Sequence, residues 1–192
     1  KRLIARCDVV VENFATGVME RLGLGYERLQ GIKPDIIMTS ISGYGHTGPQ
    51  ANYMGYGPAI VPLSGLASLS GYAGGPPKEV GISYGDPTGG ITAGARGLVP
   101  PGVLAALVAP RRTGRGQHID VSLWEATTAF VAEGWMEYAM NGRAPQRMGN
   151  RDPWMSPCDC YPAAGEDAWV TIACADEEQW RALTRAMGRP EL

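Results

Sequence analysis

The residues best suited to chemistry stand in the run Gly85-Asp-Pro-Thr-Gly-Gly90, where one carboxylate precedes a proline and two glycines. An aspartate before a proline is a common helix start, because the carboxylate accepts free N–H groups of the first turn and the proline has none. A helix N-terminus also favours the ionised carboxylate, which is the nucleophilic form. Asp86 is therefore either a helix cap or a nucleophile, and the two roles are compatible.

The cysteines and histidines do not predict a metal site. The four cysteines lack the paired spacing of a zinc site and are too few for a disulfide scaffold, so reduced thiols are expected. Two of them, Cys158 and Cys160, point to one face of an expected strand, but chelation would need two further ligands. Neither His46 nor His118 needs a catalytic role. We predict no bound metal.

Composition bounds the class of protein. The chain has 192 residues, of which 44% are hydrophobic, so it is long enough to be globular with one or two domains. Its formal charge of −2 comes from 17 basic and 19 acidic residues without long runs of one sign, which argues against a nucleic-acid partner. No stretch approaches the roughly 20 apolar residues of a membrane span. We therefore expect neither nucleic acid nor membrane as a partner.

The first part of the chain has the pattern of an α/β sheet. The β-branched run Val9 to Val11 and the apolar run Ile36 to Ile41 predict two strands, and two short helices are expected between them. The turn-rich segment Ser42 to Pro49 directly follows the second strand, where open α/β sheets tend to bind ligands. This segment is a candidate wall of a site.

Later elements complete the expected fold. We expect, in order, a helix over 56–69 with Ile60 and Leu63 inward, a helix over 86–109, a strand over 118–123, a helix over 124–140, a hairpin ending in 169–173, and a helix that Asp176 caps. Two prolines within 94–102 predict a break before Pro100, since each costs about 3 kcal/mol in a helix interior. We expect one large domain over 1–151 and the start of a smaller α+β domain over 152–192.

Three segments together resemble the class III coenzyme A transferases of the formyl-CoA and carnitine CoA transferase kind. They are Asp8-Val-Val-Val-Glu-Asn-Phe14 with Gly17 to Gly25, Ser40-Ile-Ser-Gly-Tyr-Gly45 with Thr47-Gly-Pro49, and Arg112 to Leu123. Each segment alone is weak, but their common order and plausible separations span most of the chain. The resemblance implies a Rossmann-like parallel sheet with helices, and it continues more loosely through 152–192.

The resemblance gives Asp86 a specific role. Asp86 falls where such transferases keep their catalytic aspartate, which attacks the carbonyl of an acyl-CoA thioester and forms a mixed anhydride and then an aspartyl-CoA thioester. A small carboxylic acid completes the exchange. Gly89 and Gly90 leave the backbone near Asp86 open to substrate, and Tyr56 is expected in the substrate pocket.

The same resemblance places part of the coenzyme A site. Asn13, Phe14, Ala15 and Arg21 match the segment that binds adenine and phosphate, with coenzyme A as a substrate and no tightly bound cofactor. Arg21 suits paired phosphate oxygens, although a solvated helix arginine is an equal alternative. This chain has Ala15-Thr16 where relatives commonly carry Arg-Pro, so one cationic contact is absent.

Two alternatives remain open. A 2-methylacyl-CoA racemase of the same superfamily would need a histidine where this chain has Tyr56, and a tyrosine is a poor base at neutral pH. A catalytically silent coenzyme A-binding fragment is the other. The resemblance also implies an interlocked homodimer in the cytoplasm. The chain reads as beginning inside a domain, so any targeting segment would lie upstream of Lys1, and the fragment alone is expected to be inactive.

Overall fold

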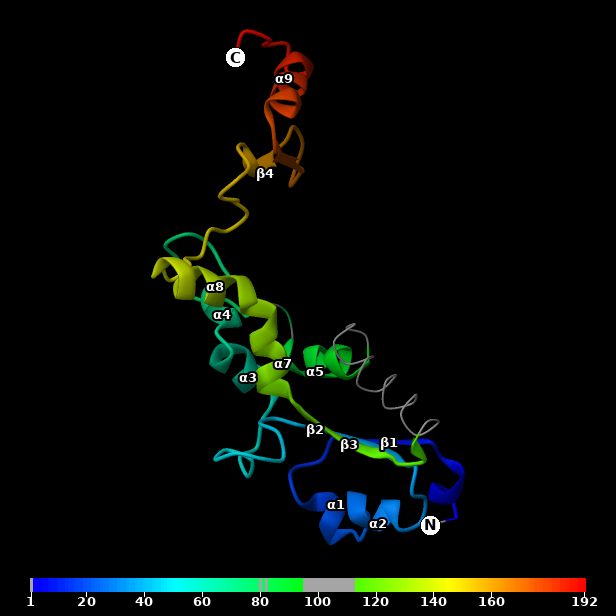
Figure 1. The fold of residues 1–192 in the computed structure, drawn as a ribbon. Helices are drawn as coiled ribbons and strands as arrows, with labels where there is room; N and C mark the ends of the chain where they lie inside the picture. The colour runs from blue at the N-terminus through cyan, green and yellow to red at the C-terminus, as the bar shows by residue number, and fades with distance from the viewer. Residues whose placement is uncertain (1, 80, 82, 95–112) are drawn as a thin grey trace. The chain divides into compact units, whose positions relative to one another are not determined.

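The computed structural model describes residues 2–79, 81, 83–94 and 113–192 of the chain (Figure 1). These residues form two compact units, one of Lys1–Ser68 with Lys78–Pro145 and the other of Leu69–Pro77 with Gln146–Leu192. The division predicted at residue 152 falls within the second unit and stays a prediction. The predicted continuation of a helix to 109 and its break before Pro100 lie outside the described residues.

The first unit is built on a parallel sheet of three strands. Strands β1 (Val9–Glu12), β2 (Ile37–Ser42) and β3 (Gln117–Ser122) lie in that order, with Val9 opposite Ile37 and Ile37 opposite Gln117. The central strand is the most buried, since Ile37 and Met38 are each 1% exposed. Burial on both faces fits a parallel strand between helical layers. The predicted α/β, Rossmann-like class is confirmed.

Two short helices cover one face of this sheet (Figure 1). A 3-10 turn, η1 (Ile4–Arg6), precedes β1, and α1 (Val18–Arg21) and α2 (Tyr26–Gln30) follow it. Leu29 of α2 is fully buried and packs with Met19 of α1 and with Met38 of β2. The predicted pair of helices between the first two strands is confirmed.

The helices that follow β2 and β3 differ in detail from the prediction (Figure 1). They are α3 (Gly57–Leu63), α4 (Leu66–Leu69), α5 (Gly85–Gly94), α7 (Leu123–Thr128), the 3-10 turn η2 (Ala129–Val131) and α8 (Ala132–Asn141). The single helix predicted over 56–69 is wrong, because Gly65 adopts a φ of +88° and separates α3 from α4. The helix predicted over 124–140 is likewise interrupted by η2. Leu63, predicted inward, is 53% exposed.

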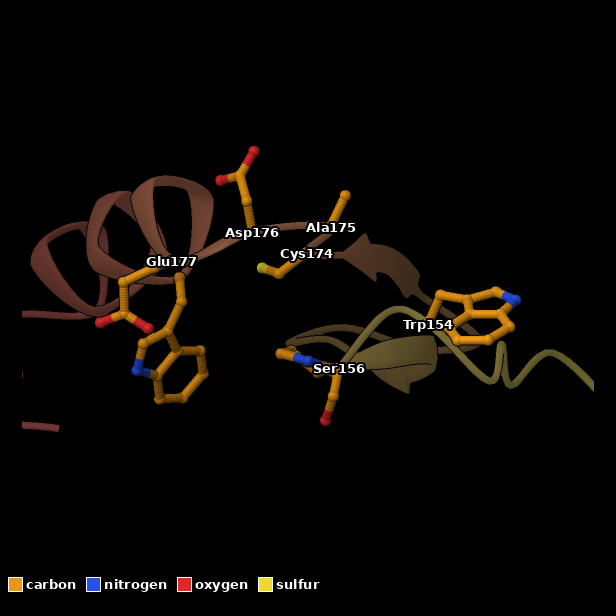
Figure 2. Close-up of a pocket in the computed structure, with 8 residues that line it drawn as sticks. Trp154, Ser156, Cys174, Ala175, Asp176 and Glu177 are labelled. Carbon is orange, nitrogen blue, oxygen red and sulfur yellow. The ribbon is translucent and has the colours of Figure 1, made fainter.

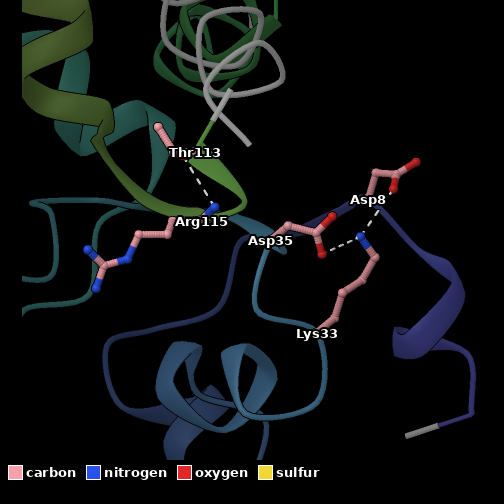
Figure 3. Close-up of polar contacts among 5 residues, drawn as sticks. All are labelled: Asp8, Lys33, Asp35, Thr113 and Arg115. Carbon is pink, nitrogen blue, oxygen red and sulfur yellow. Dashed lines mark hydrogen bonds and ion pairs between the residues drawn. The ribbon is translucent and has the colours of Figure 1, made fainter. Parts of the chain in front are cut away.

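An ion-paired lysine ties the amino ends of two strands together (Figure 3). Lys33 Nζ lies 3.3 Å from Asp8 Oδ1 and 2.8 Å from Asp35 Oδ1, where Asp8 precedes β1 and Asp35 precedes β2. The hydrogen bond to Asp35 raises the pKa of Lys33, and the same bond lowers the pKa of Asp35. Nearby, the N–H of Arg115 donates to Thr113 Oγ1 at 3.2 Å. The lysine thus links these strands at the end remote from their carboxyl termini.

The second unit contains a hairpin and one helix. Strands β4 (Cys158–Pro162) and β5 (Trp169–Ala173) pair antiparallel, and α9 (Glu177–Ala186) follows. Asp176 caps α9, because its carboxylate accepts from the N–H of Gln179 at 2.8 Å. The predicted hairpin and capped helix are confirmed. None of the described helices is long and apolar enough to cross a membrane.

Candidate functional site

A cavity of about 350 Å³ opens at the carboxyl ends of β1 and β2 in the first unit. Its wall comes from the loop after β1, the end of β2, the segment before α3, the start of α5 and the start of α7. We call it the Asp86 pocket, and its lining residues are Asn13, Phe14, Ala15, Thr16, Ile41, Ser42, Gly43, Tyr53, Met54, Gly55, Tyr56, Asp86 and Leu123. It lies where parallel sheets usually bind ligands.

Asp86 enters the pocket from the first turn of α5. It is the second residue of that helix, and its backbone N–H donates to the carbonyl of Ser83 at 2.9 Å. The predicted helix start is therefore correct, but Asp86 lies inside the helix and not at the capping position. A carboxylate in the first turn still faces the positive end of the helix dipole. Its side chain is exposed, so a molecule in the pocket can reach it.

Close backbone approach makes room for this carboxylate. A Cβ atom at Gly57, the first residue of α3, would stand 2.7 Å from Asp86 Oδ2. A Cβ at Gly85 would stand 3.0 Å from the carbonyl oxygen of Gly57, so α3 and α5 meet through two glycines. Gly43 and Gly55 cross in the same way, because a Cβ at Gly43 would lie 2.5 Å from the Cα of Gly55. Larger residues at these positions would displace the pocket wall.

A buried pair of threonines fixes α5 to the core. The hydroxyls of Thr88 in α5 and Thr127 in α7 lie 2.8 Å apart, and both side chains are fully buried. Each hydroxyl also lies 2.8 Å from a carbonyl of its own helix, that of Gly85 for Thr88 and that of Leu123 for Thr127. Such satisfied buried polar groups define one packing arrangement of two helices. They hold the turn that carries Asp86.

The structure brings most of the predicted site residues together. Asn13, Phe14, Ala15 and Tyr56 all line the Asp86 pocket. Phe14 is 51% exposed and Tyr56 is 65% exposed, so both rings remain accessible. The predicted roles of these residues stay predictions, but their convergence on one cavity is a property of the fold.

Two predicted residues, Arg21 and Gly90, are not among the described residues that line this pocket. Arg21 lies on α1, near Gly17, and its side chain is exposed. Gly89 and Gly90 lie one turn along α5 from Asp86, and a Cβ at Gly90 would meet open space. The sequence prediction also missed residues that do line the pocket, chiefly Tyr53 and Met54. The glycines on either side of Tyr56 were the available signal, because they indicate close backbone approach.

Among the described residues that line this pocket, Asp86 has the single charged side chain. Two other lining residues carry hydroxyls without hydrogen-bond partners in the described part of the chain, since Ser42 Oγ and Thr16 Oγ1 are buried and unpaired. An unpaired buried hydroxyl costs free energy until a partner arrives. The pocket therefore combines one carboxylate with apolar aromatic walls, and two of its lining residues carry buried hydroxyls without a partner. That set suits covalent catalysis by a carboxylate on a bound acyl group.

A second cavity, of about 540 Å³, belongs to the second unit (Figure 2). It lies between the start of α9 and the segment before β4, and Trp154, Cys174 and Glu177 are among its lining residues. None of the predicted site residues lines it. Among the described residues, no group of three or more histidine, cysteine or acidic side chains could hold a metal ion.

Comparison with known families decides the class of protein. The family described as CoA-transferase family III matches residues 1–192. The chain belongs to CoA-transferase family III. The class III resemblance predicted from three segments is confirmed.

Named relatives of this class III chain transfer coenzyme A. It is 40% identical over 191 residues to acetyl-CoA:oxalate CoA-transferase of Acetobacter aceti, an alignment that covers 99% of the chain and 47% of the relative. It is 36% identical over 188 residues to succinate–glutarate CoA-transferase of Agrobacterium fabrum, covering 98% of the chain and 45% of the relative. The class III chain thus spans about half the length of the curated relatives that it matches.

A solved structure has the same fold as the class III chain. The crystal structure of a CAIB/BAIF family protein from Brucella suis superposes with a TM-score of 0.86 at 36% identity, covering 100% of the chain and 48% of that protein. The parallel sheet and the helical layers described above are therefore those of a known class III architecture.

Proposed function

We propose that the full-length protein carrying this chain transfers coenzyme A from an acyl-CoA thioester to a free carboxylic acid, with Asp86 as the nucleophile. One observation carries the proposal. In the described part of the chain, the carboxylate of Asp86 is the single charged group lining a pocket that Asn13, Phe14 and Tyr56 also line. The names of the relatives supply the reaction type, since each transfers coenzyme A between organic acids.

The proposed chemistry proceeds through covalent intermediates on one carboxylate. An oxygen of Asp86 attacks the thioester carbonyl carbon, the C–S bond breaks, and a mixed anhydride and coenzyme A thiolate form. The thiolate attacks the aspartyl carbonyl, which releases the donor acid as a carboxylate and leaves an aspartyl-CoA thioester. The acceptor carboxylate attacks that thioester and expels the thiolate again. The thiolate then attacks the acceptor's acyl carbon, which releases the new acyl-CoA and regenerates Asp86.

Residues around Asp86 would bind the substrates. In this proposal Asn13, Phe14 and Ala15 contact the coenzyme A donor, and Arg21, on α1 outside the pocket, pairs with a phosphate. Ser42 and Thr16 also line the pocket, and in this proposal a bound acyl group or acceptor acid recruits their buried, unpaired hydroxyls as donors. Coenzyme A is a substrate here, and the proposal includes no tightly bound cofactor. We also propose an interlocked, cytoplasmic homodimer of the full-length protein, as the family resemblance implies.

The geometry favours a transferase over a racemase. A racemase would need a histidine at Tyr56, and neither His46 nor His118 lines the Asp86 pocket. Proton transfer next to the thioester would therefore lack a histidine to pair with Asp86 among the described residues that line the pocket. The silent-fragment alternative accounts for a preserved fold, but it gives no reason for an exposed carboxylate in the pocket.

The test uses the full-length protein with acetyl-CoA or succinyl-CoA and a panel of carboxylic acids. We expect exchange of coenzyme A, trapping of label at Asp86 by hydroxylamine, and a loss of kcat of at least about a thousandfold in Asp86→Asn. The matched control is Asp35→Asn, which removes a carboxylate at the other end of the sheet and should keep full turnover. Full turnover in Asp86→Asn would exclude the mechanism. Racemisation of a 2-methylacyl-CoA without acceptor acid would favour the alternative.

A further inference from the structure

A buried acid and imidazole face each other behind the wall of the Asp86 pocket. Glu12, the last residue of β1, is 6% exposed, and the side chain of His46, in the loop after β2, is 12% exposed. Glu12 Oε1 lies 3.7 Å from His46 Nε2, and neither atom has a hydrogen-bond partner among the described residues. Leaving both groups unpaired in a buried place would be costly, so each is the natural partner of the other.

The second oxygen of Glu12 holds the pocket wall itself. Glu12 Oε2 accepts a hydrogen bond from the backbone N–H of Phe14 at 2.7 Å. Phe14 lines the pocket together with its neighbours Asn13 and Ala15. One carboxylate therefore connects the segment Asn13–Ala15 to His46, with one oxygen for each.

His46 is in turn anchored to the third strand. Its backbone N–H donates to Asp120 Oδ2 of β3 at 2.8 Å, and the preceding Gly45 makes the turn with a φ of +81°. The His46 ring lies edge to face with that of His118, at 6.2 Å between centroids. His118 also lies 2.9 Å from Ser40 Oγ of β2. The pair is thus supported by residues of all three strands.

We propose that Glu12 and His46 are positioning residues that hold the segment Asn13–Ala15 in the conformation that the coenzyme A donor meets. They touch neither Asp86 nor the reacting atoms, so we expect their loss to change the affinity for the acyl-CoA donor. The proposal rests on the proposed function for the identity of the donor and adds two residues to its machinery. Loss of either should raise KM for acyl-CoA and leave kcat largely unchanged, because ground-state and transition-state binding lose the same interaction.

Three variants of the full-length protein test the pair. Glu12→Met keeps the size of the side chain but removes the acceptor of the Phe14 N–H, and KM for acyl-CoA should rise about fivefold to tenfold. Glu12→Gln keeps an oxygen acceptor and should stay within about twofold of the wild type. His46→Leu should raise KM in the same direction as Glu12→Met, with kcat within about twofold for both.

The matched control is Lys33→Met. This substitution removes ion pairs that join the same strands β1 and β2, but at their amino ends. It should lower stability without changing KM. A KM increase in Lys33→Met equal to that in Glu12→Met would show that general destabilisation is the cause and would overturn the proposal.

Hydrogen exchange gives a readout that does not depend on catalysis. The peptide that contains Phe14 should exchange at least about fivefold faster in Glu12→Met than in the wild type, and at the wild-type rate in Lys33→Met. An unchanged hydrogen-exchange rate at Phe14, or an unchanged KM in both Glu12→Met and His46→Leu, would contradict the proposal. If Glu12→Met does not fold, KM and the hydrogen-exchange rate at Phe14 are both measured in His46→Leu. Full turnover in Asp86→Asn would remove the transferase proposal alone and leave the exchange result standing.

Discussion

The first residue of α3 touches the proposed nucleophile, since a Cβ atom at Gly57 would lie 2.7 Å from Asp86 Oδ2. Such a distance is shorter than real Cβ atoms tolerate, so any other residue at position 57 must displace the carboxylate or the helix. Gly57 and Asp86 are 29 positions apart in sequence, from 86 minus 57, and only the packing of α3 on α5 joins them. Glycine is therefore needed at position 57 because there is no space for a side chain beside the carboxylate, and not because of its conformational freedom.

Gly57→Ala should therefore impair the reaction more than it impairs folding. The added methyl group pushes on a side chain that is free to rotate, so we expect a loss of about 1–2 kcal/mol in unfolding free energy but at least a tenfold loss in kcat. Urea unfolding and steady-state exchange of coenzyme A measure the two quantities. Gly31→Ala is the control, because Gly31 has a φ of −66° and its Cβ would make ordinary contacts from 3.5 Å. Normal kcat in Gly57→Ala would contradict the prediction.

The threonine pair should be coupled energetically. Thr88→Val and Thr127→Val each disrupt the buried hydroxyl pair at 2.8 Å, and each should cost about 1–3 kcal/mol of stability. Because both remove the same interaction, the double variant should cost less than the sum by about 0.5–1 kcal/mol. Thr128→Val is the control, since its hydroxyl bonds only to Trp124 O within its own helix. Strict additivity in the double-mutant cycle would show that the two hydroxyls do not act together.

Ser42→Ala should weaken substrate binding without destabilising the protein. Ser42 lines the Asp86 pocket, and its Oγ is buried and has no hydrogen-bond partner among the described residues. Removing an unpaired hydroxyl should leave stability unchanged or slightly higher, whereas KM for the acyl donor or the acceptor acid should rise about threefold to tenfold. Kinetics with each substrate varied in turn identify the one that is bound. A loss of stability with unchanged KM for both substrates would refute this role.

The sequence predicted the elements better than it predicted their breaks. Strands β1 to β3 follow from apolar runs bounded by turn residues, and Asp176 with Gln179 marks the start of α9. The break between α3 and α4 depends on the left-handed backbone of Gly65, which the helical spacing of apolar residues does not reveal. The predicted inward position of Leu63 was also wrong.

The pocket was predictable only in part, because some of its residues are placed by contacts between distant segments. Asp86, Phe14 and Tyr56 stand in motifs with local signals, and the sheet brings their segments to one edge. Tyr53 and Met54 lie in a loop whose course is set by the contact between Gly43 and Gly55, and no local pattern encodes such a contact. The Glu12 to His46 pair was missed because its members come from different strand ends and meet only in the folded sheet.

The stability of the first unit should depend on pH through His118. Burial, and then the neighbouring His46, lower the pKa of His118 below its ordinary value of 6.5. The unfolded chain therefore binds this proton at a higher pH than the folded chain does. As the pH falls through 6.5, the unfolded state binds a proton at His118 that the folded state does not bind. The contribution of His118 to stability therefore decreases until the folded-state pKa is reached.

His118→Gln isolates this effect. The glutamine retains a group that can bond to Ser40 Oγ, which lies 2.9 Å from the imidazole, but it does not titrate. Urea unfolding of both proteins at about pH 7.5 and about pH 5.5, on either side of 6.5, measures the change in unfolding free energy of each. The wild type should lose more stability than the variant over this interval, because the charged neighbours of His118, which are His46, Asp120, Glu12 and Glu20, are common to both. Equal losses would mean that folding does not change the proton affinity of His118.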